Sequence, residues 1–264
     1  MTEPIWIGDC AEVLPTLGIS PQLILTSPPY DNLRDYGGHK FDFERVADSL
    51  VLVIPDGGVL VWIVGDARID GSETGTSFRQ ALGFIERGLN LFDTMIYHKT
   101  NGPVTGFRGY KQRMEYMFIF ANGSPSVINR IADVPTSTGG DFKRPSIRQP
   151  SGRVYKSPGI SIPYLTIRDN VWSYNLGYQQ SHPRFPEAHA HPATFPYALA
   201  ADHILSWTNP GDLVLDPMAG SGTALRAAKD LGREFVGIEI HEPYVEIIKK
   251  RLAQETLGLD VAEA

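Results

Sequence analysis

The chain has 264 residues, of which 42% are hydrophobic and 20% charged, and its formal net charge is −6. This composition is typical of a globular protein long enough to bury a sizeable core. Because the sequence has no run of about 18 apolar residues and its N-terminus does not resemble a secretion signal, we expect a cytoplasmic protein with no membrane span. The single cysteine, Cys10, excludes an internal disulfide and any zinc site built from several cysteines.

The predicted elements of the first half alternate between strands and helices. Apolar runs predict strands at residues 5–8, 23–26, 59–65, 92–98 and 113–121. Helical periodicity appears within 48–55 and 77–88. Such alternation indicates a parallel sheet covered by helices.

The pattern is lost over residues 122–168, which are rich in Pro, Gly, Ser and Arg. We expect this segment to be a loop-rich insert, or one that orders only on binding. The flanking segments, 1–121 and 169–264, then form one domain. In its second half, a helix entered through prolines is expected within 191–208, and residues 212–252 read as strand, glycine loop, helix, strand and helix.

The charges are distributed unevenly along the chain. Residues 98–168 carry eleven Lys or Arg and three acids, a net charge of +8, whereas the remainder carries −14. A basic middle between acidic flanks is expected when one surface faces a polyanion such as nucleic acid. A solvated, loop-rich face is the alternative explanation.

The segment LILTSPPY, residues 23–30, ends a strand abruptly. Two prolines remove two ladder donors, so the strand must end at Ser27. The carbonyl groups of Ser27 and Pro28 are then available as rigid acceptors, and Tyr30 offers a stacking surface beside them. Taken alone, a simple strand-ending turn explains the segment equally well.

A glycine-rich turn follows the strand that ends at Asp216. Gly220 and Gly222 precede an alanine-rich helix, whose N–H groups would face a ligand. Leu225 occupies the third glycine position of the dinucleotide fingerprint, and the Gly-Lys pair of a phosphate-binding loop is missing. Glu239 ends the next strand, where an acid accepts hydrogen bonds from ribose hydroxyls. With Asp216 suited to a cationic amine, these residues favour S-adenosylmethionine over an ordinary β-α-β turn.

The order of these motifs resembles a known family. WIGDCAEVLPTL, TSPPYDNLRDYGG, DGGVLVWIVGD, MIYHKTN, RMEYMFIFANG, NVWSY, HPATFP, DPMAGSGTALRAA and FVGIEIHEPYVEIIKKRL occur in this order. Together they resemble the exocyclic-amino DNA methyltransferases of the permuted beta group, in which the S/D-P-P-Y motif precedes the cofactor loop. Met218 departs from the usual phenylalanine of that loop, and His241 from a common aspartate.

The resemblance implies a Rossmann-like methyltransferase fold with a mixed, mostly parallel sheet, a circularly permuted motif order and residues 122–168 as a target-recognition insert. It implies methyl transfer from S-adenosylmethionine to a flipped base of duplex DNA, with catalytic residues Ser27, Pro28, Pro29 and Tyr30. S-P-P-Y is commoner in cytosine-N4 enzymes and D-P-P-Y in adenine-N6 enzymes, so we expect cytosine N4. An adenine-N6 enzyme and a non-catalytic DNA-binding module with a relic fold remain alternatives.

By the same resemblance, a set of residues is expected to bind the cofactor: Asp9, Cys10, Thr26, His191, Thr194, Asp216, Met218, Gly220, Ser221, Gly222, Thr223, Glu239 and Ile240. Three of these have structural alternatives. Asp9 suits a helix N-cap, Cys10 a buried thiol and His191 an ordinary loop position.

Basic residues along the middle of the chain are expected to bind DNA: Arg34, Arg108, Lys111, Arg113, Lys143, Arg144, Arg148 and Arg153. We call the last four the basic quartet. His182, His189 and His191 lack a further ligand at suitable spacing, so we expect no metal, and we expect Trp172 to lie in the core. Sequence leaves open the oligomeric state, the recognition site and any companion nuclease.

Overall fold

The structure is a computed structural model that describes residues 4–29, 41–101, 110–137, 139–142, 147–148, 154–155, 160–175 and 195–254. It divides into two compact units, one formed by Met1–Asn129 with Asn170–Ala264 and the other by Arg130–Asp169. Within the described residues, no helix combines the length and apolar character needed to cross a membrane.

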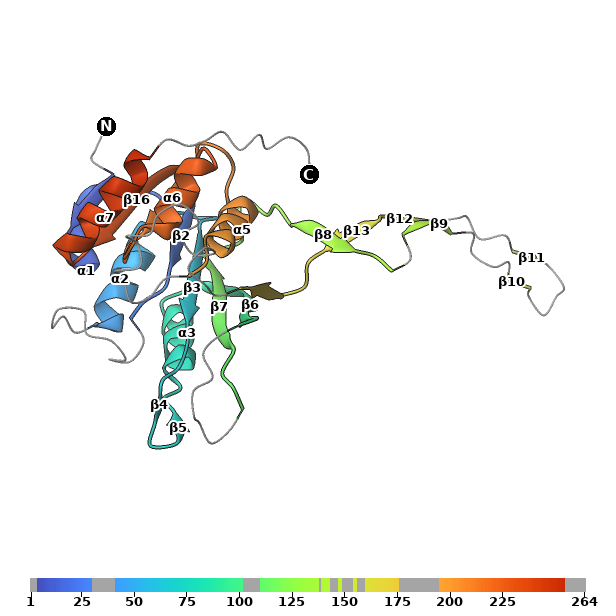
Figure 1. The fold of residues 1–264 in the computed structure, drawn as a ribbon, viewed down its shortest axis with the longest axis horizontal. Coiled ribbons are helices and arrows are strands. Elements are labelled where there is room, and N and C mark those ends of the chain that lie inside the picture. Colours follow the sequence, from blue (N-terminus) through green and yellow to red (C-terminus); the bar gives the residue numbers. More distant parts are fainter. Residues whose placement is uncertain are drawn as a thin grey trace. The chain divides into compact units, whose positions relative to one another are not determined.

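An eight-stranded sheet forms the centre of the first unit (Figure 1). In spatial order its strands are β1 (Ile5–Ile7), β16 (Glu234–Glu239), β15 (Leu213–Asp216), β2 (Leu23–Thr26), β3 (Val59–Val64), β7 (Met114–Ala121), β6 (Asn90–Lys99) and β14 (Val171–Tyr174). Every neighbouring pair is parallel except the two that involve β7. The predicted mixed, mostly parallel sheet is therefore confirmed.

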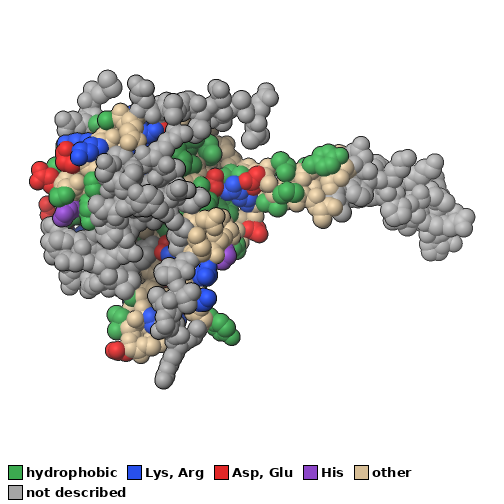
Figure 2. All heavy atoms as spheres, viewed as in Figure 1, with side chains coloured by type: hydrophobic (Ala, Val, Ile, Leu, Met, Phe, Trp, Pro, Cys, Tyr) green, Lys and Arg blue, Asp and Glu red, His purple; other side chains and the backbone are tan. Residues whose placement is uncertain are grey.

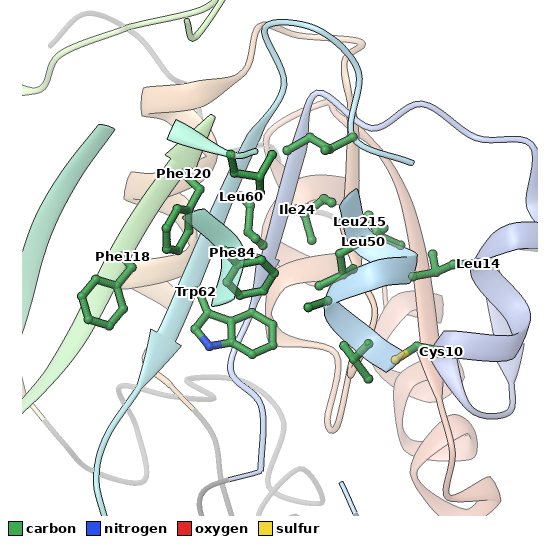
Figure 3. Close-up of a cluster of buried hydrophobic side chains, with 14 of the residues drawn as sticks. Cys10, Leu14, Ile24, Leu50, Leu60, Trp62, Phe84, Phe118, Phe120 and Leu215 are labelled. Carbon is green, nitrogen blue, oxygen red and sulfur yellow. The ribbon is translucent and has the colours of Figure 1, made fainter. Parts of the chain in front are cut away.

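Helices cover both faces of this sheet: α1 (Cys10–Leu17), α2 (Phe43–Val53), α3 (Thr76–Glu86), α5 (Tyr197–Trp207), α6 (Thr223–Asp230) and α7 (Glu242–Ala253). The larger hydrophobic cluster joins α1, α2 and α3 to one face, through residues such as Leu14, Leu50 and Phe84 (Figure 3). A second cluster joins α6 and α7 to β1 through Leu225, Ile248 and Ile5. Strands buried on both faces explain why the sequence shows continuous apolar runs.

The predicted helix within 48–55 lies too late in the chain. Helix α2 begins after Asp42, whose carboxylate Oδ1 accepts a hydrogen bond from the Arg45 N–H at 3.3 Å, and it ends at Val53. The apolar stretch suggested only the second half of the helix, because the first turns carry charged residues. Trp172, predicted to lie in the core, is buried.

The second unit contains successive antiparallel strand pairs, which the expectation of a loop-rich insert, or one that orders only on binding, did not include. Its pairs are β8 (Ala132–Pro135) with β13 (Leu165–Ile167), β9 (Gly140–Phe142) with β12 (Ile160–Ile162), and β10 (Ile147–Arg148) with β11 (Val154–Tyr155). Strands of two to four residues are too short to produce a detectable period. A separate small hairpin, β4 (Arg68–Ile69) with β5 (Ser72–Glu73), belongs to the first unit.

The division between the units falls at Arg130, later than residue 122. Asn129 is held by the first unit: its N–H donates to the Ser206 carbonyl at 2.8 Å, and its side-chain amide donates to the carbonyl groups of Leu205 and Thr208, each at 3.2 Å. Asn129 is therefore tied to α5 and belongs to the first unit. The recognition role of the second unit stays a prediction.

Candidate active site

Three neighbouring parallel strands bring the two principal motifs to one edge of the sheet. Strand β2 ends at Thr26, β15 at Asp216 and β16 at Glu239, and the spatial order is β16-β15-β2. The carboxyl ends of parallel strands point the same way, and ligands of open α/β sheets bind outside them. The Ser27 segment and the glycine loop therefore leave the sheet side by side, although they are far apart in sequence.

A buried hydrogen bond joins these two segments directly. Thr26 Oγ1 donates to Asp216 Oδ1 at 2.9 Å, and the Met218 N–H donates to the same oxygen at 3.2 Å. Thr26 is 0% and Asp216 2% exposed. Burial raises the pKa of the Asp216 carboxyl to about 7, while the two donors act against that rise. The end of the Ser-Pro-Pro strand is thus fixed to the start of the glycine loop.

The glycine loop needs glycine at two positions. Gly220 and Gly222 have φ values of 54° and 76°, in the left-handed region that favours glycine. Gly222 also packs tightly, because a Cβ there would lie 3.1 Å from Ile248 Cγ1. Its N–H closes the turn onto the Ala219 carbonyl at 2.7 Å. Between the glycines, the buried Ser221 Oγ has no hydrogen-bond partner among the described residues.

Glu239 contacts this loop from the neighbouring strand. Its Oε2 accepts from the Gly220 N–H at 2.7 Å, and its Oε1 accepts from the His241 N–H at 2.8 Å. Burial raises the pKa of the carboxyl, and both donors oppose the rise. Each oxygen uses one acceptor position on the backbone, so further acceptor capacity remains for hydroxyl groups of a ligand.

Asp9 and Cys10 follow β1, next to Glu239. Asp9 caps α1, because its Oδ1 accepts from the Ala11 N–H at 2.9 Å, and its Oδ2 accepts from Arg45 at 3.1 Å. The N-cap interpretation is confirmed, and cofactor contact by Asp9 stays a prediction. Cys10 is buried beside Leu14 in the larger cluster (Figure 3). Burial raises the pKa of its thiol to about 12, which argues against a nucleophilic role.

The remaining described candidates lie around these groups. Pro28 is buried, while Ser27 and Pro29 are half-buried directly after β2. Met218 is half-buried and packs against the larger cluster, and Ile240 is half-buried after Glu239. Thr223 begins α6 and is buried.

Several predicted site residues lie outside the described residues: Tyr30, Arg34, Arg108, Lys143, Arg144, Arg153, His191 and Thr194. The three histidines considered as metal ligands, His182, His189 and His191, also lie outside them. Arg148 is in β10, but its side chain is not among those described. Where side chains are described, no group of three or more His, Cys, Asp or Glu could hold a metal ion.

Two of the predicted DNA-binding residues lie just before β7. Lys111 is exposed, and the Arg113 guanidinium donates to the Thr100 carbonyl at 2.6 Å. Strand β7 begins beside the carboxyl end of β6, because Met114 pairs with His98. Since β6 runs parallel to β2, these cations share the sheet edge with Ser27. Figure 2 shows Lys and Arg side chains on this face near the start of β7.

Sequence reasoning missed two buried arginines under the glycine loop, Arg226 and Arg251. The Arg251 guanidinium donates to the Ser221 carbonyl and to Thr223 Oγ1, both at 3.1 Å. A signal was present, because the buried face of α7 runs from Val245 through Ile248 to Arg251 at helical spacing.

Known proteins match nearly the whole chain. Residues 22–250 match the family of N6/N4 methyltransferases described as DNA methylase. The chain is 43% identical over 249 residues to the orphan methyltransferase M.BamHII of Bacillus amyloliquefaciens, covering 93% of this chain and 90% of that protein. It is 29% identical over 251 residues to the type II methyltransferase M.HpaI of Haemophilus parainfluenzae, covering 91% and 71%.

Solved structures agree with this match. TTHA0409 from Thermus thermophilus, complexed with S-adenosyl-L-methionine, has a TM-score of 0.62 and 25% identity, over 96% of both chains. PvuII DNA methyltransferase, which is cytosine-N4-specific, has a TM-score of 0.65 and 19% identity over 96% of this chain and 87% of its own, and it supports the fold alone. From the family match and the close relative, the chain belongs to the N6/N4 DNA methylase family.

Proposed function

We propose that this DNA methyltransferase transfers a methyl group from S-adenosylmethionine to the exocyclic N4 of cytosine in duplex DNA. The observation that carries the proposal is the buried Thr26–Asp216 hydrogen bond of 2.9 Å. It fixes the strand that leads into Ser27-Pro28-Pro29 against the glycine loop, so an acceptor cluster for a base and a loop for a cofactor adjoin each other.

The residues present fit the cofactor. Ser221 Oγ is buried without a partner among the described residues, and the buried Glu239 carboxylate retains acceptor capacity. Glu239 would hold the ribose hydroxyls, while Asp216 and residues 220–223 would hold the methionine part. When bound there, S-adenosylmethionine supplies the methyl group. The complex of TTHA0409 with this cofactor supports the assignment.

The catalytic segment answers a difficulty of the chemistry. An exocyclic amine is a poor nucleophile because its lone pair is delocalised into the base. Hydrogen bonds from its two N–H groups to the Ser27 hydroxyl oxygen and the Pro28 carbonyl would localise that lone pair and aim it at the methyl group. Proline restricts the backbone that carries the acceptor. Tyr30 would stack on the base, which must leave the duplex to be reached.

Serine at the first motif position favours cytosine N4 over adenine N6. An aspartate there is commoner in adenine enzymes, so the assignment rests on a motif association as well as on geometry. The alternative of a non-catalytic relic is disfavoured, because Ser27, both loop glycines and Glu239 are all retained. Duplex DNA is the proposed partner, with the basic quartet, Arg34, Arg108, Lys111 and Arg113 as its contacts.

The test uses the purified chain, S-adenosylmethionine and unmethylated genomic DNA. After digestion to nucleosides, mass spectrometry should detect N4-methylcytosine and no N6-methyladenine. N6-methyladenine would overturn the base assignment. Cofactor binding without methylation of any DNA would support the relic alternative. The matched control is Ser27→Ala, which should bind the cofactor as the wild type does and lose most methyl transfer, because the acceptor acts only in the reacting complex.

A further inference from the structure

Two arginines are buried beneath the glycine loop. Arg226 of α6 is 8% exposed and Arg251 of α7 is 3% exposed. A buried guanidinium is costly unless hydrogen bonds or an opposite charge compensate it. The partners of each arginine therefore indicate what it does.

Helix packing accounts for Arg226. Its Nε forms an ion pair with Asp230 Oδ2 at 2.9 Å, and Tyr197 Oη donates to the same oxygen at 3.0 Å. Its Nη1 donates to the carbonyl groups of Arg251 and Gln254 at the end of α7, at 2.9 and 3.0 Å. Arg226 thus neutralises one carboxylate and satisfies the last carbonyl groups of a helix.

Arg251 has a different set of partners. Its Nη1 donates to the Ser221 carbonyl and to Thr223 Oγ1, and it forms no ion pair with any described residue. Burial and the neighbouring Arg226 lower the pKa of Arg251 to about 10, so it remains charged at neutral pH. The attraction of the Asp230 charge opposes this shift. Among the described residues no carboxylate forms an ion pair with Arg251, so its positive charge lies behind the loop without a direct partner of opposite charge there, next to the N-terminus of α6, which also favours anions.

We infer that Arg251 is a positioning residue that fixes the Ser221–Thr223 turn and biases the loop toward ligands carrying an amino-acid carboxylate. The inference rests on the proposed function, in which this loop holds the methionine part of the cofactor. Arg251 acts from behind the loop, through the Ser221 carbonyl and through its charge. Glu239 acts on the nucleoside end, so the two contributions are separable.

The test compares two ligands that differ only in the carboxylate, S-adenosylmethionine and decarboxylated S-adenosylmethionine, by competitive titration calorimetry. In Arg251→Met the affinity for S-adenosylmethionine should fall about tenfold or more, while the affinity for the decarboxylated ligand should change less than about threefold. Equal loss for both ligands, or no loss for either, would overturn the inference. A wild type that binds neither ligand would contradict the proposed function instead.

Three further variants separate positioning from folding. Arg226→Met removes a buried guanidinium whose hydrogen bonds go to Asp230 and to the end of α7 and not to the loop, so Tm should fall while the ratio of the two affinities stays at the wild-type value. Arg251→Lys keeps the charge and should keep that ratio within about threefold. Arg251→Gln keeps a donor without the charge and should lose the discrimination even if Arg251→Met fails to fold. Discrimination kept by Arg251→Gln, or lost equally in Arg226→Met, would refute the role of Arg251.

Discussion

Removal of the Thr26 hydroxyl should destabilise the protein in a pH-dependent way. Thr26→Val keeps the branched shape that suits β2 and deletes the donor at 2.9 Å from Asp216 Oδ1. Both side chains are buried, so water cannot replace the lost bond. The cost should be about 1.5–3 kcal/mol when the acceptor is ionised and about 0.5–1.5 kcal/mol when it is neutral.

The ionisation of Asp216 sets the pH window. Burial raises its pKa from 3.8 to about 7, with the Glu239 charge adding to the rise, while the Thr26 hydroxyl and the Met218 N–H lower it. Because the pKa of Asp216 is higher in the folded than in the unfolded protein, the native state binds more protons than the unfolded state between these two pKa values. The contribution of Asp216 to the free energy of unfolding is therefore greatest below pH 4. It falls by up to about 4 kcal/mol as the pH rises to about 7.

Loss of the Thr26 donor raises the pKa of Asp216 further and extends this window upward. The destabilisation by Thr26→Val should therefore be larger at pH 8.5 than at pH 5.5, as measured by urea unfolding against wild type at each pH. Thr26→Ser should recover most of the difference. Thr208→Val is the control, since the buried Thr208 hydroxyl donates to the Ile204 carbonyl and accepts from the Arg233 guanidinium at 2.9 Å, and neither partner changes charge between pH 5.5 and 8.5. Equal destabilisation by Thr26→Val at both pH values would refute the reasoning.

Three other experiments test separate parts of the protein. Glu239→Ala should weaken S-adenosylmethionine binding by about 1.5–3 kcal/mol in titration calorimetry, and unchanged affinity would remove Glu239 from the cofactor site. Cys10, whose thiol pKa burial raises to about 12, should react with a disulfide reagent at pH 8 no faster than the protein unfolds, whereas prompt labelling would contradict its burial. Replacing the basic quartet with alanine should leave cofactor affinity intact and reduce the slope of log K against log salt by roughly 0.9 per lost phosphate contact. An unchanged slope with unchanged specificity would place DNA elsewhere.

The main elements of the site follow from local sequence signals. Asp216, the loop glycines and Glu239 were located because a strand, a tight turn and a helix each produce a signal within a few residues. The same reasoning found the end of β2, because Pro28 and Pro29 cannot continue a ladder. These signals depend only on neighbours in the chain.

Contacts between distant segments were not predictable in the same way. Thr26 and Asp216 lie 190 positions apart, and only the strand order brings them together. Strand β14 joins the sheet by pairing with β6, and four residues carry too little periodicity to predict that pairing. Helical spacing places Arg251 on the same face of α7 as Val245 and Ile248, but its hydrogen bonds to Ser221 and Thr223 depend on how α7 packs against the glycine loop, which spacing does not reveal.

The strand order also explains why the permuted motif order does not separate the two halves of the site. The Ser27-Pro28-Pro29 segment comes early in the chain and the glycine loop late, yet β2 lies directly beside β15, with Leu23 paired to Val214 and Ile24 to Leu215. Side chains alternate between faces, so a slip of one residue would turn Thr26 away from Asp216. The prolines and the Thr26–Asp216 hydrogen bond therefore act together. The prolines set the residue at which β2 ends, and the hydrogen bond fixes the register in which Thr26 points toward Asp216.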